Sequence, residues 1–169
     1  GMSSDCTVSI AKKYPVRIVY NEKRNTGNAH ILGVKEAKGE ILAFIDADNE
    51  LPKKDWMIKM VNLLLNSPRA AGVFPLLYVK RTHPAISRCY ALAQANPIVA
   101  LAHKTGKTAA TNIITKDNYF PIGGNGLLLR KSLVLQVGNF RSFSGQDDVD
   151  LTYRLAKLGY SFILVTETG

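Results

Sequence analysis

The sequence is poor in cysteine and histidine and has no long uncharged apolar segment. Its 169 residues include 2 cysteines and 3 histidines, and Cys6 and Cys89 lack the spacing of a metal site. Two such cysteines fit a reducing compartment better than a disulfide-stabilised secreted domain. We find neither a signal-peptide pattern nor an apolar run that could span a bilayer. The sequence therefore predicts a cytoplasmic protein, with the inner face of the membrane as the alternative location.

The charge balance is strongly basic. Lys and Arg number 22 against 13 Asp and Glu, which gives a formal net charge of +9. This excess favours anionic partners such as nucleotide phosphates, lipid phosphates or an acidic membrane surface. Nucleic acid is disfavoured because no basic run is interleaved with aromatic residues. The length and the 46% hydrophobic content predict one domain over residues 1–169.

One short apolar run ends in a pair of carboxylates. Residues 41–45 are continuously apolar, which is typical of a strand buried on both faces of a parallel sheet. Asp46 and Asp48 follow this run, at the strand end where open α/β sheets bind ligands. Two hard oxygen donors suit Mn²⁺ or Mg²⁺ carrying a phosphorylated substrate. The alternative is that Asp48 and Asn49 only cap the helix expected after Pro52.

Expected strands and helices alternate through the first half of the chain. Helices are expected at 5–14, 26–38 and 52–66, and strands at 16–20, 41–45 and 71–79. This alternation predicts an α/β fold with a mostly parallel sheet flanked by helices.

The second half is less regular. We expect strands at 127–129 and 162–165, helices at 84–103, 131–137 and 149–158, and a loop at 105–118. The helix at 84–103 is interpreted as a core helix. The alternative is an interfacial helix on a membrane, because basic residues flank it.

A second pair of carboxylates stands at an expected helix start. Asp147 and Asp148 precede the helix at 149–158, where the helix dipole stabilises an anion. Mutual repulsion of paired carboxylates raises one pKa toward a range useful for proton abstraction. The alternative is simple helix capping.

The histidines His30, His83 and His103 share no motif, and we interpret each as a surface or core residue.

Three motifs in order resemble the family 2 glycosyltransferases, which have the glycosyltransferase-A fold. The first is Gly27-x-Ala29-x-x-x-Gly33-x-x-x-Ala37-x-Gly39 before Asp46-Ala47-Asp48, similar to the polyprenyl-phosphate sugar transferases of that family. The others are Gly123-Gly124-Asn125-Gly126 through Arg130 with Gly138-Asn139-Phe140, and Asp147-Asp148-x-Asp150-Leu151-x-x-Arg154. The resemblance covers almost the whole chain.

The resemblance implies an inverting transfer of a sugar from a nucleotide-diphosphate donor, a UDP- or GDP-sugar. Asp48, with Asp46 beside it, would bind Mn²⁺ or Mg²⁺ on the diphosphate. Asp148 or Asp147 would deprotonate the acceptor hydroxyl. The residues implied to contact substrate are Gly123, Gly124, Asn125 and Arg154. The implied acceptor is a saccharide or a polyprenyl lipid, in the synthesis of a cell-envelope polysaccharide or glycolipid.

The chain departs from the family pattern at its beginning. The family's first βαβ unit, which holds the nucleotide base and ribose, has no counterpart here, so we expect a fragment of a longer enzyme. A sheet without that edge is expected to expose apolar surface and to self-associate. Two alternatives stay open: a phosphate hydrolase with an Asp-x-Asp site, and a non-catalytic fragment that binds sugar nucleotides.

Overall fold

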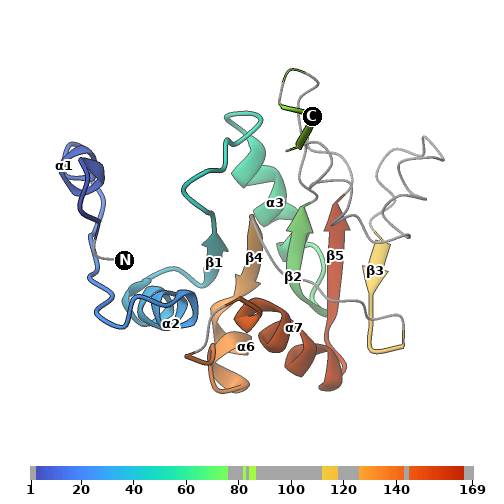
Figure 1. The fold of residues 1–169 in the computed structure, drawn as a ribbon. Coiled ribbons are helices and arrows are strands. Elements are labelled where there is room, and N and C mark those ends of the chain that lie inside the picture. Colours follow the sequence, from blue (N-terminus) through green and yellow to red (C-terminus); the bar gives the residue numbers. More distant parts are fainter. Residues whose placement is uncertain are drawn as a thin grey trace.

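The computed structural model is an α/β structure (Figure 1). It describes residues 3–75, 82, 84–86, 112–117, 126–142 and 145–165. Its helices are α1 (Thr7–Ala11), α2 (Thr26–Glu36), α3 (Trp56–Leu65), α6 (Lys131–Gln136) and α7 (Asp147–Lys157). Its strands are β1 (Ile41–Phe44), β2 (Ala70–Pro75), β3 (Asn112–Ile114), β4 (Leu127–Arg130) and β5 (Ser161–Val165).

The strands form one mixed sheet. Their order is β1-β4-β2-β5-β3. Only the β2–β5 pairing is parallel among those described, while β1–β4, β2–β4 and β3–β5 are antiparallel. The α/β class is confirmed, but the expectation of mostly parallel pairing is corrected. The strands β1, β2 and β5 do run in one direction, and β4 lies between β1 and β2 in the opposite direction.

The three inner strands are buried on both faces by different helices. Leu127 and Leu129 of β4 belong to a core cluster with residues of α2, α6 and α7, whereas Leu128 belongs to a cluster with α3. Side chains alternate in the same way along β5, where Phe162 and Ile163 face opposite clusters. The sheet therefore lies between α3 on one side and α2, α6 and α7 on the other (Figure 1).

Strand β1 is not buried on both faces as the sequence predicted. Leu42 is buried, but Ala43 and Ile45 are exposed. In the described sheet β1 is an edge strand that pairs only with β4. Helix α3 packs mainly on the neighbouring strands β2 and β4, so on that face of β1 Ile41 is half-buried and Ala43 stays exposed.

The predicted strand at 16–20 was also wrong. These residues form no strand, and Val16 and Tyr20 are each 56% exposed. Strand-forming side chains do not make a strand without a neighbouring strand to pair with. The expected loop at 105–118 contains β3, and this was a second error.

Most of the other predicted elements are confirmed with shifted boundaries. Helix α2 begins after Asn25, whose side-chain oxygen accepts the backbone N–H of Asn28 at 2.7 Å, as an N-cap does. Helix α3 begins at Trp56, beyond Pro52.

The helix predicted at 84–103 lies almost wholly outside the described residues. Within the part of the chain that is described, no helix is both long and apolar enough to cross a membrane.

Candidate active site

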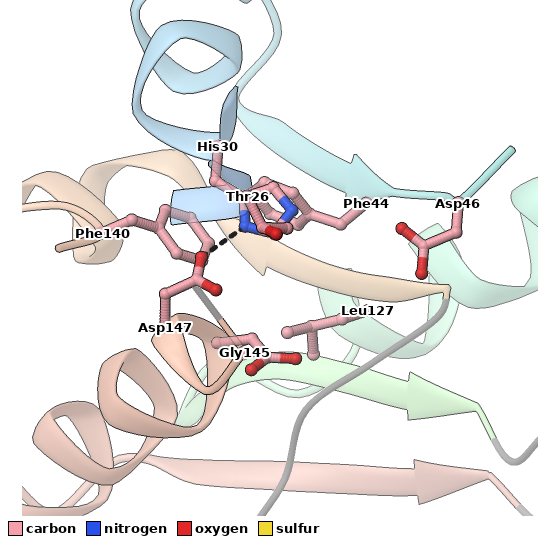
Figure 2. A pocket seen from close by; sticks show the side chains of 9 residues that line it. Thr26, His30, Phe44, Asp46, Leu127, Phe140, Gly145 and Asp147 are labelled. Atoms are coloured by element: carbon pink, nitrogen blue, oxygen red, sulfur yellow. Dashed lines mark hydrogen bonds and ion pairs between the residues drawn. The ribbon is translucent and has the colours of Figure 1, made fainter. Parts of the chain in front are cut away.

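A cavity lies beside the ends of β1 and β4 and the first turns of α2 and α7 (Figure 2). Its lining residues are Thr26, His30, Phe44, Asp46, Leu127, Phe140, Gly145, Asp147 and Asp148. Asp46 follows the carboxyl end of β1, and Asp147 is the first residue of α7. The sequence placed both carboxylate pairs at element ends, and the structure brings Asp46 together with Asp147 and Asp148.

Asp46 lies close enough to other carboxylates for their charges to affect its pKa. Its pKa is raised above the ordinary value, first by partial burial and then by the charges of Asp48 and Asp148. The nearby His30 acts in the opposite direction and lowers the pKa of Asp46. Extra negative charge at this point is therefore unfavourable, and a bound cation would relieve it.

A turn holds Asp46 and Asp48 on the loop after β1. The backbone N–H of Asn49 donates to the carbonyl of Asp46 at 3.0 Å, and the Asn49 side-chain oxygen accepts the N–H of Asp46 at 3.3 Å. The Asn49 amide also donates to Asp48 at 3.3 Å. Because α3 begins only at Trp56, Asp48 and Asn49 do not cap it. Asp48 is exposed and is not among the residues that line the cavity.

Asp147 is buried and paired with a histidine. Its carboxylate Oδ2 lies 2.6 Å from Nδ1 of His30, and the two side chains are 3% and 22% exposed. Figure 2 shows this contact between His30 on α2 and Asp147 on α7, both of which line the cavity. The sequence did not identify His30 as a site residue, because its partner Asp147 is far away in the chain and no local motif marks the pair. The scarcity of histidine was the only signal available.

Asp148 differs from its neighbour in exposure and contacts. It is half-buried, lines the cavity, and its Oδ1 accepts the backbone N–H of Val149 at 2.8 Å. Its charge reaches Asp46, as the raised pKa of Asp46 indicates. Both adjacent carboxylates line the cavity, but Asp147 is buried in its contact with His30, whereas Asp148 is half-buried.

Gly126, the last residue of the glycine-rich segment, directly precedes Leu127, which lines the cavity. Gly126 has φ of +79° and its N–H donates to the carbonyl of Phe44 at 2.8 Å. A Cβ at this position would lie 3.0 Å from Cγ of Pro75. The positive φ therefore favours glycine, and an added Cβ would also require Pro75 to shift by a few tenths of an ångström. Gly123, Gly124 and Asn125 lie outside the described residues.

The family model for "Glycosyl transferase family 2" matches residues 2–134, which is most of the chain. The chain belongs to glycosyl transferase family 2. A search of curated proteins gives no match.

Two solved structures have the same fold as this family 2 chain. One is the mannosyltransferase PcManGT from Pyrobaculum calidifontis in complex with GDP-Man and Mn²⁺, with a TM-score of 0.65 and 20% identity. The other is residues 1–349 of TarS from S. aureus, with a TM-score of 0.66 and 16% identity. Each match covers 98% of this chain but only 45% and 46% of the other chains, so this chain spans less than half of their length.

The structure does not bring Arg154 to the cavity of this family 2 chain. Its guanidinium donates to the carbonyls of Val137 and of Asn139, the latter at 2.8 Å, and pairs with Asp150 at 2.7 Å. Asn139 has φ of +69°, so these bonds hold a left-handed turn after α6. In this structure Arg154 joins α7 to the end of α6.

The metal site predicted for the family 2 chain consists of two carboxylates. Among the described residues, no group of three or more His, Cys, Asp or Glu side chains is arranged to hold a metal ion. Mg²⁺ and Mn²⁺ are commonly bound by one or two carboxylates together with substrate phosphate oxygens. The donor set Asp46 and Asp48, with their unfavourable mutual charge, fits an ion that arrives with a diphosphate.

Proposed function

We propose that this chain carries the catalytic site of a glycosyltransferase that uses a nucleotide-diphosphate sugar. The observation that carries the proposal is the placement of Asp46 and Asp148 in one cavity, from segments far apart in sequence. Membership of family 2 supports the reaction class, and it gives no support to the phosphate hydrolase that the Asp-x-Asp pattern left open.

Asp46 and Asp48 would hold Mn²⁺ or Mg²⁺ on the diphosphate of the donor. The ion would neutralise the charge that develops on the departing nucleotide diphosphate. The proposal gains support from the similar structure of PcManGT, whose complex contains GDP-Man and Mn²⁺. A GDP-sugar is one of the two donor types to test first, and a UDP-sugar is the other.

Asp148 would act as the general base. It would take the proton of the acceptor hydroxyl, whose oxygen would attack the anomeric carbon while the bond to the diphosphate oxygen breaks. Such a direct displacement inverts the anomeric configuration. Both carboxylates line the cavity, and Asp148 is favoured over Asp147 because it is only half-buried, whereas the Asp147 carboxylate is buried against His30. The saccharide or polyprenyl-lipid acceptor, the membrane surface and self-association stay predictions.

The test is release of UDP or GDP from a panel of nucleotide sugars in the presence of Mn²⁺ and candidate acceptors. The Asp148→Asn variant should lower kcat by about 10²–10⁴-fold, the usual contribution of a general base. Its donor binding should be retained, because Asp48 and Asp46 are unchanged. Consumption of donor at equal rates by the wild type and by Asp148→Asn would contradict the assignment of the base.

A further inference from the structure

His30 connects the two segments that carry the proposed metal ligands and the proposed base. It lies on α2, its Nδ1 contacts Asp147 on α7 at 2.6 Å, and its ring packs against Phe44 of β1. Phe44 is two residues before Asp46, and Asp147 is directly before Asp148. One side chain therefore touches both sides of the cavity.

The aromatic surroundings fix the orientation of the His30 ring. Its centroid lies 5.3 Å from that of Phe44 and 4.8 Å from that of Phe140, and the two phenyl rings are 5.1 Å apart. The Phe44 contacts are edge-to-face, a favoured geometry for aromatic pairs. Held in this way, Nδ1 is directed at Asp147 (Figure 2).

The pairing satisfies a carboxylate that would otherwise be costly to bury. The Asp147 side chain is only 3% exposed, and an ionised carboxylate at such a position needs a strong hydrogen-bond donor. The form of His30 that carries a hydrogen on Nδ1 supplies this donor. Asp147 opens α7, so its position decides where the first turn of that helix begins.

We propose that His30 is a positioning residue for sugar transfer. By holding Asp147, it fixes the first turn of α7 and so presents Asp148 to the cavity at the correct place relative to Asp46. This inference rests on the proposed function for its kinetic consequence, but the structural part can be measured on its own. In this account His30 exchanges no proton with the substrate.

Two variants separate the hydrogen bond from the packing. His30→Phe keeps an aromatic ring against Phe44 and Phe140 but removes the donor to Asp147. His30→Asn keeps a donor N–H near the position of Nδ1 but loses the ring. A matched control is Arg141→Ala, because Arg141 pairs with Asp150 of the same helical turn at 3.1 Å from outside the cavity.

The first measurement is amide hydrogen exchange along α7. The N–H of Asp150 donates to the carbonyl of Gln146 at 2.9 Å and reports the first turn, whereas the N–H of Leu158 reports the last. His30→Phe should speed exchange at Asp150 about ten- to hundredfold, as loss of a charge-assisted hydrogen bond implies. Exchange at Leu158 should stay as in the wild type. His30→Asn should restore much of the protection, and Arg141→Ala should change it little.

The second measurement is steady-state kinetics. His30→Phe should lower kcat about ten- to hundredfold with a donor KM within about threefold of wild type, since small misplacement of a reacting group costs rate rather than donor binding. His30→Asn should recover part of kcat. Unchanged exchange at Asp150 in His30→Phe, or unchanged kcat in an active enzyme, would overturn the inference. If the wild type transfers no sugar, the proposed function fails, and the exchange data still decide whether His30 fixes α7.

Discussion

Asp46 and Asp148 line one cavity although they come from opposite halves of the chain, and the charge of Asp148 contributes to the raised pKa of Asp46. One follows the edge strand β1 and the other is the second residue of α7. A fold that maintains like charges in one cavity gives up some stability there. This pattern is typical of functional sites, where carboxylates are arranged for a ligand rather than for the free protein.

The first prediction concerns stability and pH. Burial and the charges of Asp48 and Asp148 raise the pKa of Asp46 in the folded state. Its ionisation therefore disfavours folding as the pH rises above the unfolded pKa. Asp46→Asn should be more stable than the wild type at pH 7, and the difference should vanish as the pH falls below about 4. Solvent screening should keep the gain below about 1 kcal/mol. Thermal unfolding without added metal measures it.

Asp55→Asn is a control, because the pKa of Asp55 is shifted in the opposite direction to that of Asp46. Asp55 is exposed, and its hydrogen bond with Lys59 holds the pKa of this carboxyl below its usual value. Its ionised form favours folding above the unfolded pKa, and this contribution is lost as the pH falls. Asp55→Asn should therefore not stabilise the protein at pH 7. If both variants changed stability in the same direction at pH 7, the electrostatic account of Asp46 would be wrong.

The second prediction concerns the packing of β2 against β4. A Cβ at Gly72 would lie 2.3 Å from the carbonyl oxygen of Leu128 and 2.6 Å from a methyl group of Leu129. Because the nearer of these two atoms belongs to the backbone of β4, the clash can be relieved only if β2 and β4 move apart. Gly72→Ala should destabilise the domain by about 1–3 kcal/mol or more, measured by urea unfolding.

Gly33→Ala is the matched control for this substitution. Gly33 lies inside α2, and nothing is within 4 Å of an added Cβ. Alanine favours the helix over glycine by about 1 kcal/mol, so Gly33→Ala should stabilise the protein. Equal effects of the two substitutions would contradict the described strand pairing.

The third prediction tests the role of Arg154. Arg154→Met should destabilise the protein by about 1–3 kcal/mol, because the carbonyls of Val137 and Asn139 lose their donor. Arg141→Ala removes the more exposed partner of the same Asp150 and should cost less than about 1 kcal/mol. Urea unfolding of both variants measures the difference. Weaker donor binding in Arg154→Met without loss of stability would instead favour the substrate-contact role that the family resemblance implied.

The correct predictions of helices and strands came from local patterns in the sequence. The apolar run before Asp46 predicted a strand, and the acidic pair before an amphipathic segment predicted the start of α7. Helices and their ends depend mainly on neighbouring residues, so their signals are contained in short windows. In this way the sequence placed both carboxylate pairs at element ends, and their roles in a site stay predictions.

The failures depend on partners far apart in the chain. The segment at 16–20 has strand-forming residues but no pairing in the described sheet, and the burial of β1 depends on which helix covers its neighbours. His30 becomes part of the site only because α7 begins beside it. Such contacts are properties of the tertiary structure, which hydrophobic periodicity does not encode.

The most direct test of the central claim is metal-dependent nucleotide binding. We would titrate UDP, GDP and their sugars by calorimetry, with and without Mn²⁺, into this chain and into Asp48→Ala. We expect binding that requires Mn²⁺ and is lost in Asp48→Ala, since Asp48 would hold the ion on the diphosphate. Mn²⁺-dependent binding of equal strength in both proteins would contradict the assignment of this carboxylate pair to the metal.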